Sequence, residues 1–160
     1  AAAHEGPVYL RFGRPVVPVF IPEDMPFEIG KGILLQEGTD VTIVATGHLV
    51  WESLVAAEEL EKEGISCEVI NIHTIKPLDE EIILKSVEKT GKIVTAEEHN
   101  YLGGLGESVA GMLARKRPTI QEFVAVNDTF GESATPAELM KKYGIDADAV
   151  KAAVKRILAR

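Results

Sequence analysis

The stretch that decides the fold is residues 40–47, DVTIVATG, a run of β-branched and small residues that ends in a glycine. A short continuous apolar run of this kind is typical of a strand that is buried on both faces. Apolar residues then recur at helical spacing, at Val50, Leu54, Ala57 and Leu60, and Gly64 follows. The spacing predicts a helix over residues 48–63 that ends at this glycine. A buried strand followed by an amphipathic helix is the repeating unit of a parallel α/β sheet.

The same alternation continues on both sides of this unit. Strand-like runs stand at residues 32–38 (GILLQEG), 66–72 (SCEVINI), 92–98 (KIVTAEE) and 119–126 (TIQEFVAV). Helical patterns stand at residues 79–90, 104–115, 135–144 and 146–160. Strands that alternate with helices predict a mostly parallel sheet with helices on both of its faces.

Local signals mark the ends of these helices. Asp79, Thr135 and Asp146 each precede a helical pattern and carry a side-chain oxygen that suits an N-cap. Gly91 and Gly144 stand where two of the patterns stop, as helix-ending glycines do. We therefore expect helices that begin and end at these residues.

The composition excludes several classes of protein. The 160 residues are 46% hydrophobic and 26% charged, which fits one folded domain and not a disordered chain. Seventeen Lys and Arg against 25 Asp and Glu give a net charge of −8, which disfavours nucleic acid and anionic membranes as partners. Apolar runs stay well short of the roughly 20 residues that span a bilayer. The single cysteine excludes an intrachain disulfide and fits a reduced, cytoplasmic setting.

The start of the chain differs from the rest. A strand-like run of apolar residues (Val8, Tyr9, Leu10 and Phe12) is followed by four prolines (Pro15, Pro18, Pro22 and Pro26). Each proline removes a backbone donor and favours an extended conformation of the residue before it. We therefore expect residues 1–15 to be a strand that belongs to a preceding domain, residues 16–30 a proline-rich linker, and residues 31–160 one folded domain.

Polar residues stand where the predicted strands end, and ligands gather at the carboxyl ends of parallel strands. The candidate cluster is His73, Glu98, His99 and Asn100. The alternative is that these positions are polar because loops are polar and helices need caps. Glu97 and Glu98 are neighbours on a strand, so they point to opposite faces and do not form an acid–base pair.

The glycine-rich segment 103–108, GGLGES, follows a strand and opens a helix, as a phosphate-binding loop does. Val109 replaces the third glycine of the dinucleotide pattern, and the lysine of a Walker motif is missing. The alternative is that Gly106 allows close packing of the helix on a strand. The four histidines contain no pair at helical ligand spacing, so no metal site is predicted. Cys67 lies inside a strand, which favours a core position.

Arg14 stands in the loop Gly13-Arg14-Pro15, after the strand-like run and before the linker. A guanidinium held by a proline and a tight turn suits bidentate binding of a phosphate. The alternative is an ordinary surface ion pair.

Five segments resemble the C-terminal part of transketolase, and they follow that family's order. They are GPVYLRFGRP (6–15), EIGKGILLQEGTDVTIVATG (28–47), VINIHTIKPLD (69–79), TAEEHNYLGGLGESVA (95–110) and FGESATPAELMKKYGI (130–145). Together they cover nearly the whole chain. The likeness is strongest to the bacterial and archaeal members that are often split into two subunits.

The resemblance implies a three-layer α/β/α domain with a five-stranded mixed sheet, in which residues 32–38 form the one antiparallel strand. It implies that residues 1–15 are the end of a pyrimidine-binding domain, and that Arg14 contacts the phosphate of the substrate. Gly13 stands where many relatives have a serine, which changes the local hydrogen bonding.

The resemblance also implies a function. Transketolase uses thiamine diphosphate and Mg²⁺ to move a two-carbon ketol unit between sugar phosphates of the pentose phosphate pathway. The sequence lacks the family's GDG metal motif, so we expect no cofactor on this chain and no activity from it alone. The implied partners are the remaining transketolase domains, or an N-terminal subunit, and a second copy in a homodimer. The alternatives are the corresponding domain of deoxyxylulose-phosphate synthase or of a 2-oxo-acid dehydrogenase beta subunit, and a non-enzymatic anion-binding module.

Overall fold

The computed structural model describes residues 1–11, 13 and 16–160. Their strands are β1 (Ile33–Gln36), β2 (Val41–Ala45), β3 (Cys67–Asn71), β4 (Lys92–Asn100) and β5 (Ile120–Val126). Their helices are α1 (Leu49–Lys62), α2 (Glu80–Thr90), α3 (Leu105–Lys116), α4 (Pro136–Tyr143) and α5 (Ala147–Leu158). Each predicted strand and helix of residues 31–160 is present, within a few residues of its expected bounds.

The strands form one five-stranded sheet in the order β1-β3-β2-β4-β5. Strand β2 runs parallel to β3 and β4, and β4 runs parallel to β5. Strand β1 is antiparallel to β3, with Ile33 opposite Asn71. The mixed sheet with one antiparallel strand is therefore confirmed.

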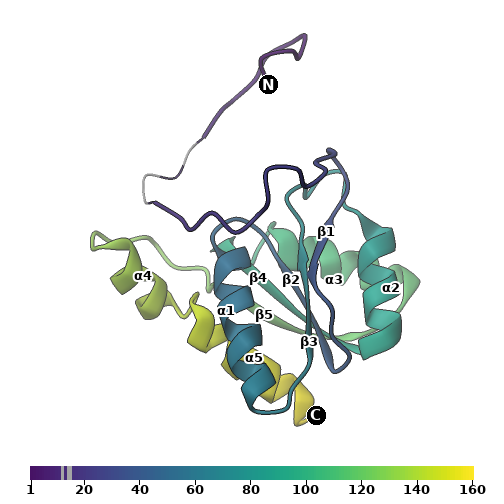
Figure 1. Cartoon of the computed structure of the whole chain (residues 1–160). Helices are drawn as coiled ribbons and strands as arrows, with labels where there is room; N and C mark the ends of the chain where they lie inside the picture. The colour runs from purple at the N-terminus through teal and green to yellow at the C-terminus, as the bar shows by residue number, and fades with distance from the viewer. Residues whose placement is uncertain (12, 14–15) are drawn as a thin grey trace.

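Helices cover both faces of the sheet (Figure 1). Helices α1 and α5 lie on one face, where Ile43 and Val69 point into their core. Helices α2 and α3 lie on the other face, over Val44 and Ile70. Burying each of these side chains stabilises the fold by about 1.5–3 kcal/mol. The three-layer α/β/α architecture is confirmed.

The predicted helix caps are confirmed. The carboxylate of Asp79 accepts a hydrogen bond from the Ile82 amide at the start of α2. Asp146 accepts one from the Ala149 amide at the start of α5. Thr135 stands at the N-cap of α4. These ends are set by local side chains, which is why the sequence pattern places them.

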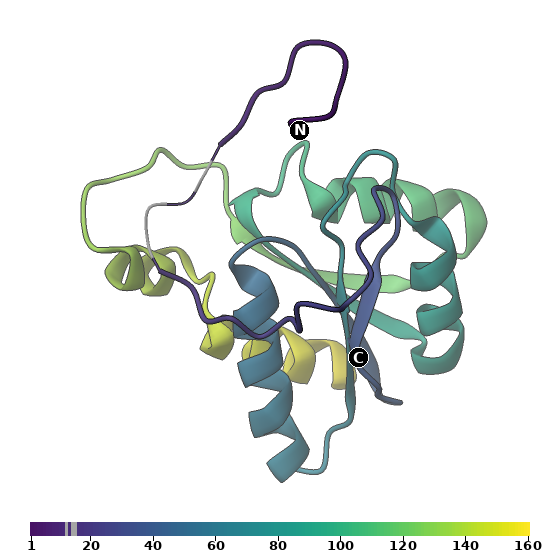
Figure 2. The same cartoon turned by 45° about the horizontal axis from the view of Figure 1, so that its top comes forward.

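The described residues before β1 lie outside helices and strands, and the part from residue 16 onward crosses the start of α1 (Figure 2). Two aromatic contacts hold it there. The ring centroids of Phe20 and Trp51 lie 5.6 Å apart, and those of Phe27 and His73 lie 4.4 Å apart. Residues 8–11 are exposed and have no strand partner among the described residues. Their assignment to a preceding domain stays a prediction.

In the described part of the chain, none of the helices combines the length and apolar character needed to cross a membrane.

Candidate functional site

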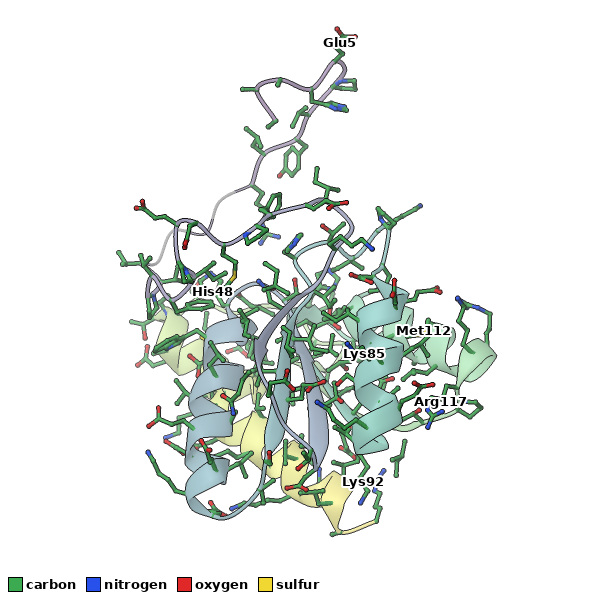
Figure 3. The ribbon with its side chains drawn as sticks, turned by 45° about the vertical axis from the view of Figure 1, so that its right-hand side comes forward. Glu5, His48, Lys85, Lys92, Met112 and Arg117 are labelled. Carbon is green, nitrogen blue, oxygen red and sulfur yellow. The ribbon has the colours of Figure 1, made fainter. Side chains whose placement is uncertain are left out.

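Strands β2, β3 and β4 end at the same edge of the sheet, next to the start of α1. In Figure 3, His48 marks this end and Lys92 marks the opposite one. A small pocket of about 240 Å³ opens here. Its lining residues are Thr46, Gly47, Ile75, Glu97, Glu98, His99, Gly103 and Gly104. This volume is below the roughly 300–1,000 Å³ of sites that enclose a drug-sized ligand.

Glu97 closes the floor of this pocket. Its side chain is buried, and its two carboxylate oxygens accept hydrogen bonds from the amides of Leu105 and Gly106, both at 2.8 Å. These are the first amides of α3, whose N-terminus favours a negative charge. The donors that a bound phosphate would need are therefore already used by a side chain of the same protein.

The glycines of the 103–108 segment serve this closed arrangement. A Cβ at Gly104 would lie 2.1 Å from the Glu97 Oε2 atom. A Cβ at Gly106 would lie 2.5 Å from the ring of Phe123 on β5. Both distances are too short for a real contact, so a side chain at either position would displace Glu97 or Phe123. The close-packing interpretation of Gly106 is confirmed.

Glu98 and His99 are the predicted cluster residues that share the pocket. Glu98 is exposed, on the opposite side of the strand from Glu97, as the alternation along a strand requires. Its Oε2 atom lies 3.8 Å from Nε2 of His48. Nδ1 of His99 donates to the carbonyl of Asn100 at 2.9 Å.

His73 and Asn100 have other contacts. Asn100 Nδ2 donates to Asp128 Oδ1 at 3.0 Å, which ties the end of β4 to the loop after β5. Nδ1 of His73 lies 2.9 Å from the Thr74 hydroxyl, and the ring stacks on Phe27. Its Nε2 atom is buried without a hydrogen-bond partner among the described residues. The predicted cluster is therefore divided: two members face the pocket, and two hold loops in place.

A larger hollow of about 670 Å³ lies beside the pocket, between the start of α1, helix α4 and the N-terminal segment. Its polar lining includes Arg11, His48 and Glu98. A Cβ at Gly13 would lie 3.0 Å from Nε2 of His48, so the backbone at residue 13 rests on that ring. Arg14, the predicted phosphate ligand, lies outside the described residues.

Among the described residues, no group of three His, Cys, Asp or Glu side chains comes together as a metal-ligand set. The glycine-rich helix start is filled by Glu97. Burial, and secondarily Asp40, raises the pKa of the Cys67 thiol to about 12, so this cysteine is a core residue and not a nucleophile.

Sequence reasoning missed a second buried carboxylate at the opposite end of the sheet. Glu68 on β3 is 4% exposed and forms an ion pair with Lys89 of α2, which also contacts Glu37 at 3.2 Å. Burial alone would raise the pKa of Glu68, but hydrogen bonds from Lys89 and Ser86 hold it below its ordinary value. The available signal was a glutamate inside an apolar strand, which needs a partner.

Fold and site together define a three-layer α/β/α domain whose glycine-rich helix start is capped by its own buried Glu97. The chain belongs to the transketolase C-terminal domain family. The family model described as "Transketolase, C-terminal domain" matches residues 30–150.

The chain spans about half the length of the first curated relatives that it matches. It is 46% identical to a 6-deoxy-6-sulfo-D-fructose transketolase subunit of Clostridium sp. (strain MSTE9), over 99% of this chain and 49% of that protein. It is 42% identical to a putative transketolase C-terminal section of Methanocaldococcus jannaschii, over 98% of this chain and 49% of that one. A solved structure titled "Split gene transketolase, inactive beta4 tetramer" is 47% identical with a TM-score of 0.86, over 89% of this chain and 47% of that chain.

Proposed function

We propose that this chain is the C-terminal section of a thiamine-diphosphate-dependent transketolase and that it acts through assembly. The observation that carries the proposal is the match of nearly all of this chain to about half of relatives that are named as transketolase subunits or sections. The closed glycine-rich helix start supports it, because a domain whose anion donors are used internally fits a supporting role.

In this proposal the cofactor and Mg²⁺ are held by the remaining domains or by a companion N-terminal subunit. The complete assembly transfers a two-carbon ketol unit between sugar phosphates, in the pentose phosphate pathway of the cytoplasm. No bond-making step is assigned to the described residues of this chain. Because Glu97 already accepts hydrogen bonds from the first amides of α3, that helix start does not bind a competing anion.

The proposed contribution to substrate binding is Arg14. Residues 1–15 complete the pyrimidine-binding domain, residues 16–30 link it, and residues 31–160 form the C-terminal domain. Two observations support this division. Tyr9 is 88% exposed, so the apolar residues 8–10 are left open to solvent. The backbone at Gly13 rests on His48 and lines the same hollow as Glu98, at the carboxyl edge of the sheet.

We also propose that the chain associates with a second copy, as a homodimer within the larger assembly. The support is the solved relative whose title describes a beta4 tetramer. An anion-binding module at residues 99–106, the non-enzymatic alternative, is disfavoured by the carboxylate of Glu97 at that helix start. The names of the relatives favour transketolase over the other two enzyme families.

Reconstitution tests the proposed function. The chain and its companion N-terminal subunit are purified separately and mixed, and ketol transfer from a ketose phosphate to an aldose phosphate is followed. We expect turnover only from the mixture, and no binding of thiamine diphosphate to this chain in calorimetry. Tight cofactor binding by the chain alone, or a stable mixed complex without turnover, would contradict the proposal.

Arg14→Ala tests the substrate contact within the same assay. Losing a bidentate charged contact is expected to raise the KM for the phosphorylated substrate at least about tenfold. Arg11→Ala is the matched control, because this neighbouring arginine lines the hollow without being the proposed ligand. Equal effects of both variants would count against Arg14 as a specific ligand.

A further inference from the structure

The two edges of the sheet are built differently. Strand β1 has four residues, and its register against β3 shifts between Leu34 and Gln36. Strand β5 has seven residues, IQEFVAV, with neither a lysine nor a proline. Short strands, bulges, lysines and prolines are the features that keep sheet edges from pairing with other chains. Edge β1 is protected in this way and edge β5 is not.

The outer backbone of β5 is free of partners within the described chain. Strand β5 pairs with β4, from Ile120 opposite Lys92 to Val126 opposite Asn100, and the register shifts between Ala96 and Asn100, where the extra residues lie on β4 and not on the edge strand. Residues 120–125 otherwise receive one weak hydrogen bond, from the Thr95 hydroxyl to the Glu122 carbonyl at 3.5 Å. An edge strand therefore presents a row of unused donors and acceptors to solvent.

Apolar side chains accompany this free edge. Phe123 is 38% exposed and Ile120 is 37% exposed. Phe123 lines a hollow of about 490 Å³ between β5 and α3. The other residues of this lining are Tyr101, Glu107, Ala110, Ala125 and Asn127. An exposed aromatic in a hollow, with polar groups around it, is the usual composition of a contact surface.

We propose that the β5 edge pairs antiparallel with the β5 edge of a second copy of this chain. The proposal rests on the self-association put forward under the proposed function and names the surface that carries it. A twofold axis at Phe123 would place this residue opposite its own counterpart. By counting along the strands, Glu122 would then stand opposite Val124 of the second copy, so the two Glu122 side chains do not face each other.

The charges at this edge permit a second copy as the occupant. Glu122 is the one charged residue of β5, and it forms ion pairs with Arg156 at 3.2 Å and Arg160 at 2.7 Å. The edge is therefore neutralised, although each copy carries a net charge of −8. Two copies repel each other at long range and meet at a neutral, apolar strand. Association is thus expected to strengthen as the salt concentration rises.

Sedimentation velocity over a wide concentration range tests the proposal on the whole chain. We expect a species of twice the chain mass of 17.3 kDa, and a dissociation constant at least about 100-fold higher for Phe123→Glu. Leu34→Glu is the matched control on β1, because Leu34 is 39% exposed. Circular dichroism checks that both variants are folded. Dimers that survive Phe123→Glu, or that are lost with Leu34→Glu, overturn the proposal.

Cross-linking gives an independent measurement that does not depend on placing a charge at residue 123. Cys67 is fully buried, so the thiol introduced by Phe123→Cys is the accessible one. We expect a disulfide-linked dimer on oxidation, and none for Leu34→Cys. The wild-type chain could instead be monomeric, with residue 123 shielded by the companion subunit. That result would assign the β5 edge to the companion subunit and overturn the proposal. A monomeric chain that still restores ketol transfer would overturn it, together with the proposed self-association, while leaving the proposed transketolase role intact.

Discussion

Two glutamates at opposite ends of the sheet are buried in different ways. Glu97, at the end of β4, is 1% exposed and is held by two backbone amides of α3. Glu68, on β3, is 4% exposed and is held by the ammonium group of Lys89. Backbone donors are fixed by the helix, whereas a lysine side chain must be ordered to make its contact. The comparison teaches that Glu97 organises a loop, whereas Glu68 is a buried charge that Lys89 neutralises.

The largest expected effect is that of Glu97→Ala. It leaves two amides at a buried helix start without acceptors, so the free energy of unfolding is expected to fall by about 3 kcal/mol. Urea unfolding followed by the fluorescence of Trp51, the single tryptophan, measures it. Glu98→Ala is the control, because this adjacent exposed side chain is expected to change stability by less than about 0.5 kcal/mol. Equal losses in both variants would contradict the special role of Glu97.

Gly104→Ala tests the same loop from the other side. The added Cβ would overlap Glu97 Oε2, so the carboxylate must move from the amides, at an expected cost of about 2 kcal/mol. Gly111→Ala, within α3, is the control. Its Cβ would meet only ordinary contact at 3.6 Å from Arg115, so it is expected to gain up to about 1 kcal/mol in helix propensity. A Gly104→Ala variant with an unchanged free energy of unfolding would show that the loop adjusts to the added Cβ at little cost.

Lys89→Met tests the other glutamate. It leaves Glu68 buried beside fewer partners, and we expect a loss of about 1–2 kcal/mol at pH 7. Because the pKa of Glu68 is lowered in the folded chain, the stabilisation is present above its ordinary value of 4.5 and is lost as the pH falls through the lower folded value. The difference from wild type should therefore shrink on acidification below pH 4.5.

The control for this pair is Lys85→Met, one turn earlier on α2 and labelled in Figure 3. It is exposed, and its removal is expected to give a small change that does not follow this pH dependence. A difference between Lys89→Met and wild type that persists at low pH would mean that the lysine acts by packing and not by charge.

The smallest expected effect is that of His48→Ala. The contact between His48 and Glu98 is 3.8 Å long and partly exposed, so stability should change by less than about 0.5 kcal/mol. The same urea titration measures this change. A loss above about 1 kcal/mol would show that the segment at Gly13 is firmly packed on this ring.

Features set by neighbours in sequence could be predicted, and features set by distant contacts could not. The caps at Asp79, Thr135 and Asp146 depend on amides a few residues away, and each is confirmed. The antiparallel direction of β1 came from the family resemblance, since its residues read like those of any short strand. The alternation of side chains along a strand shows towards which face of the sheet Glu97 and Glu68 point. It does not show which group each of them contacts on that face.

The candidate site shows the same limit. The polar residues at the strand ends were visible in the sequence, but their division between a pocket and structural contacts was not. His73 is turned toward Phe27, 46 positions earlier along the chain, by a contact that leaves no periodic signal. The capping of α3 by Glu97 bridges eight residues and a glycine-rich turn, and no simple spacing rule covers it.

The contacts of Phe20 with Trp51 and of Phe27 with His73 have a consequence for motion. Because of these two contacts, most of residues 16–30 are held on the surface of the domain and do not act as a free linker. The seven residue-to-residue steps from Gly13 to Phe20 span at most about 25 Å when fully extended. Any group carried at Gly13 is thereby confined to a small volume around α1, where its effective concentration is high without a tight interface of its own. The segment needs no rigid structure to deliver its residues to the edge of the sheet.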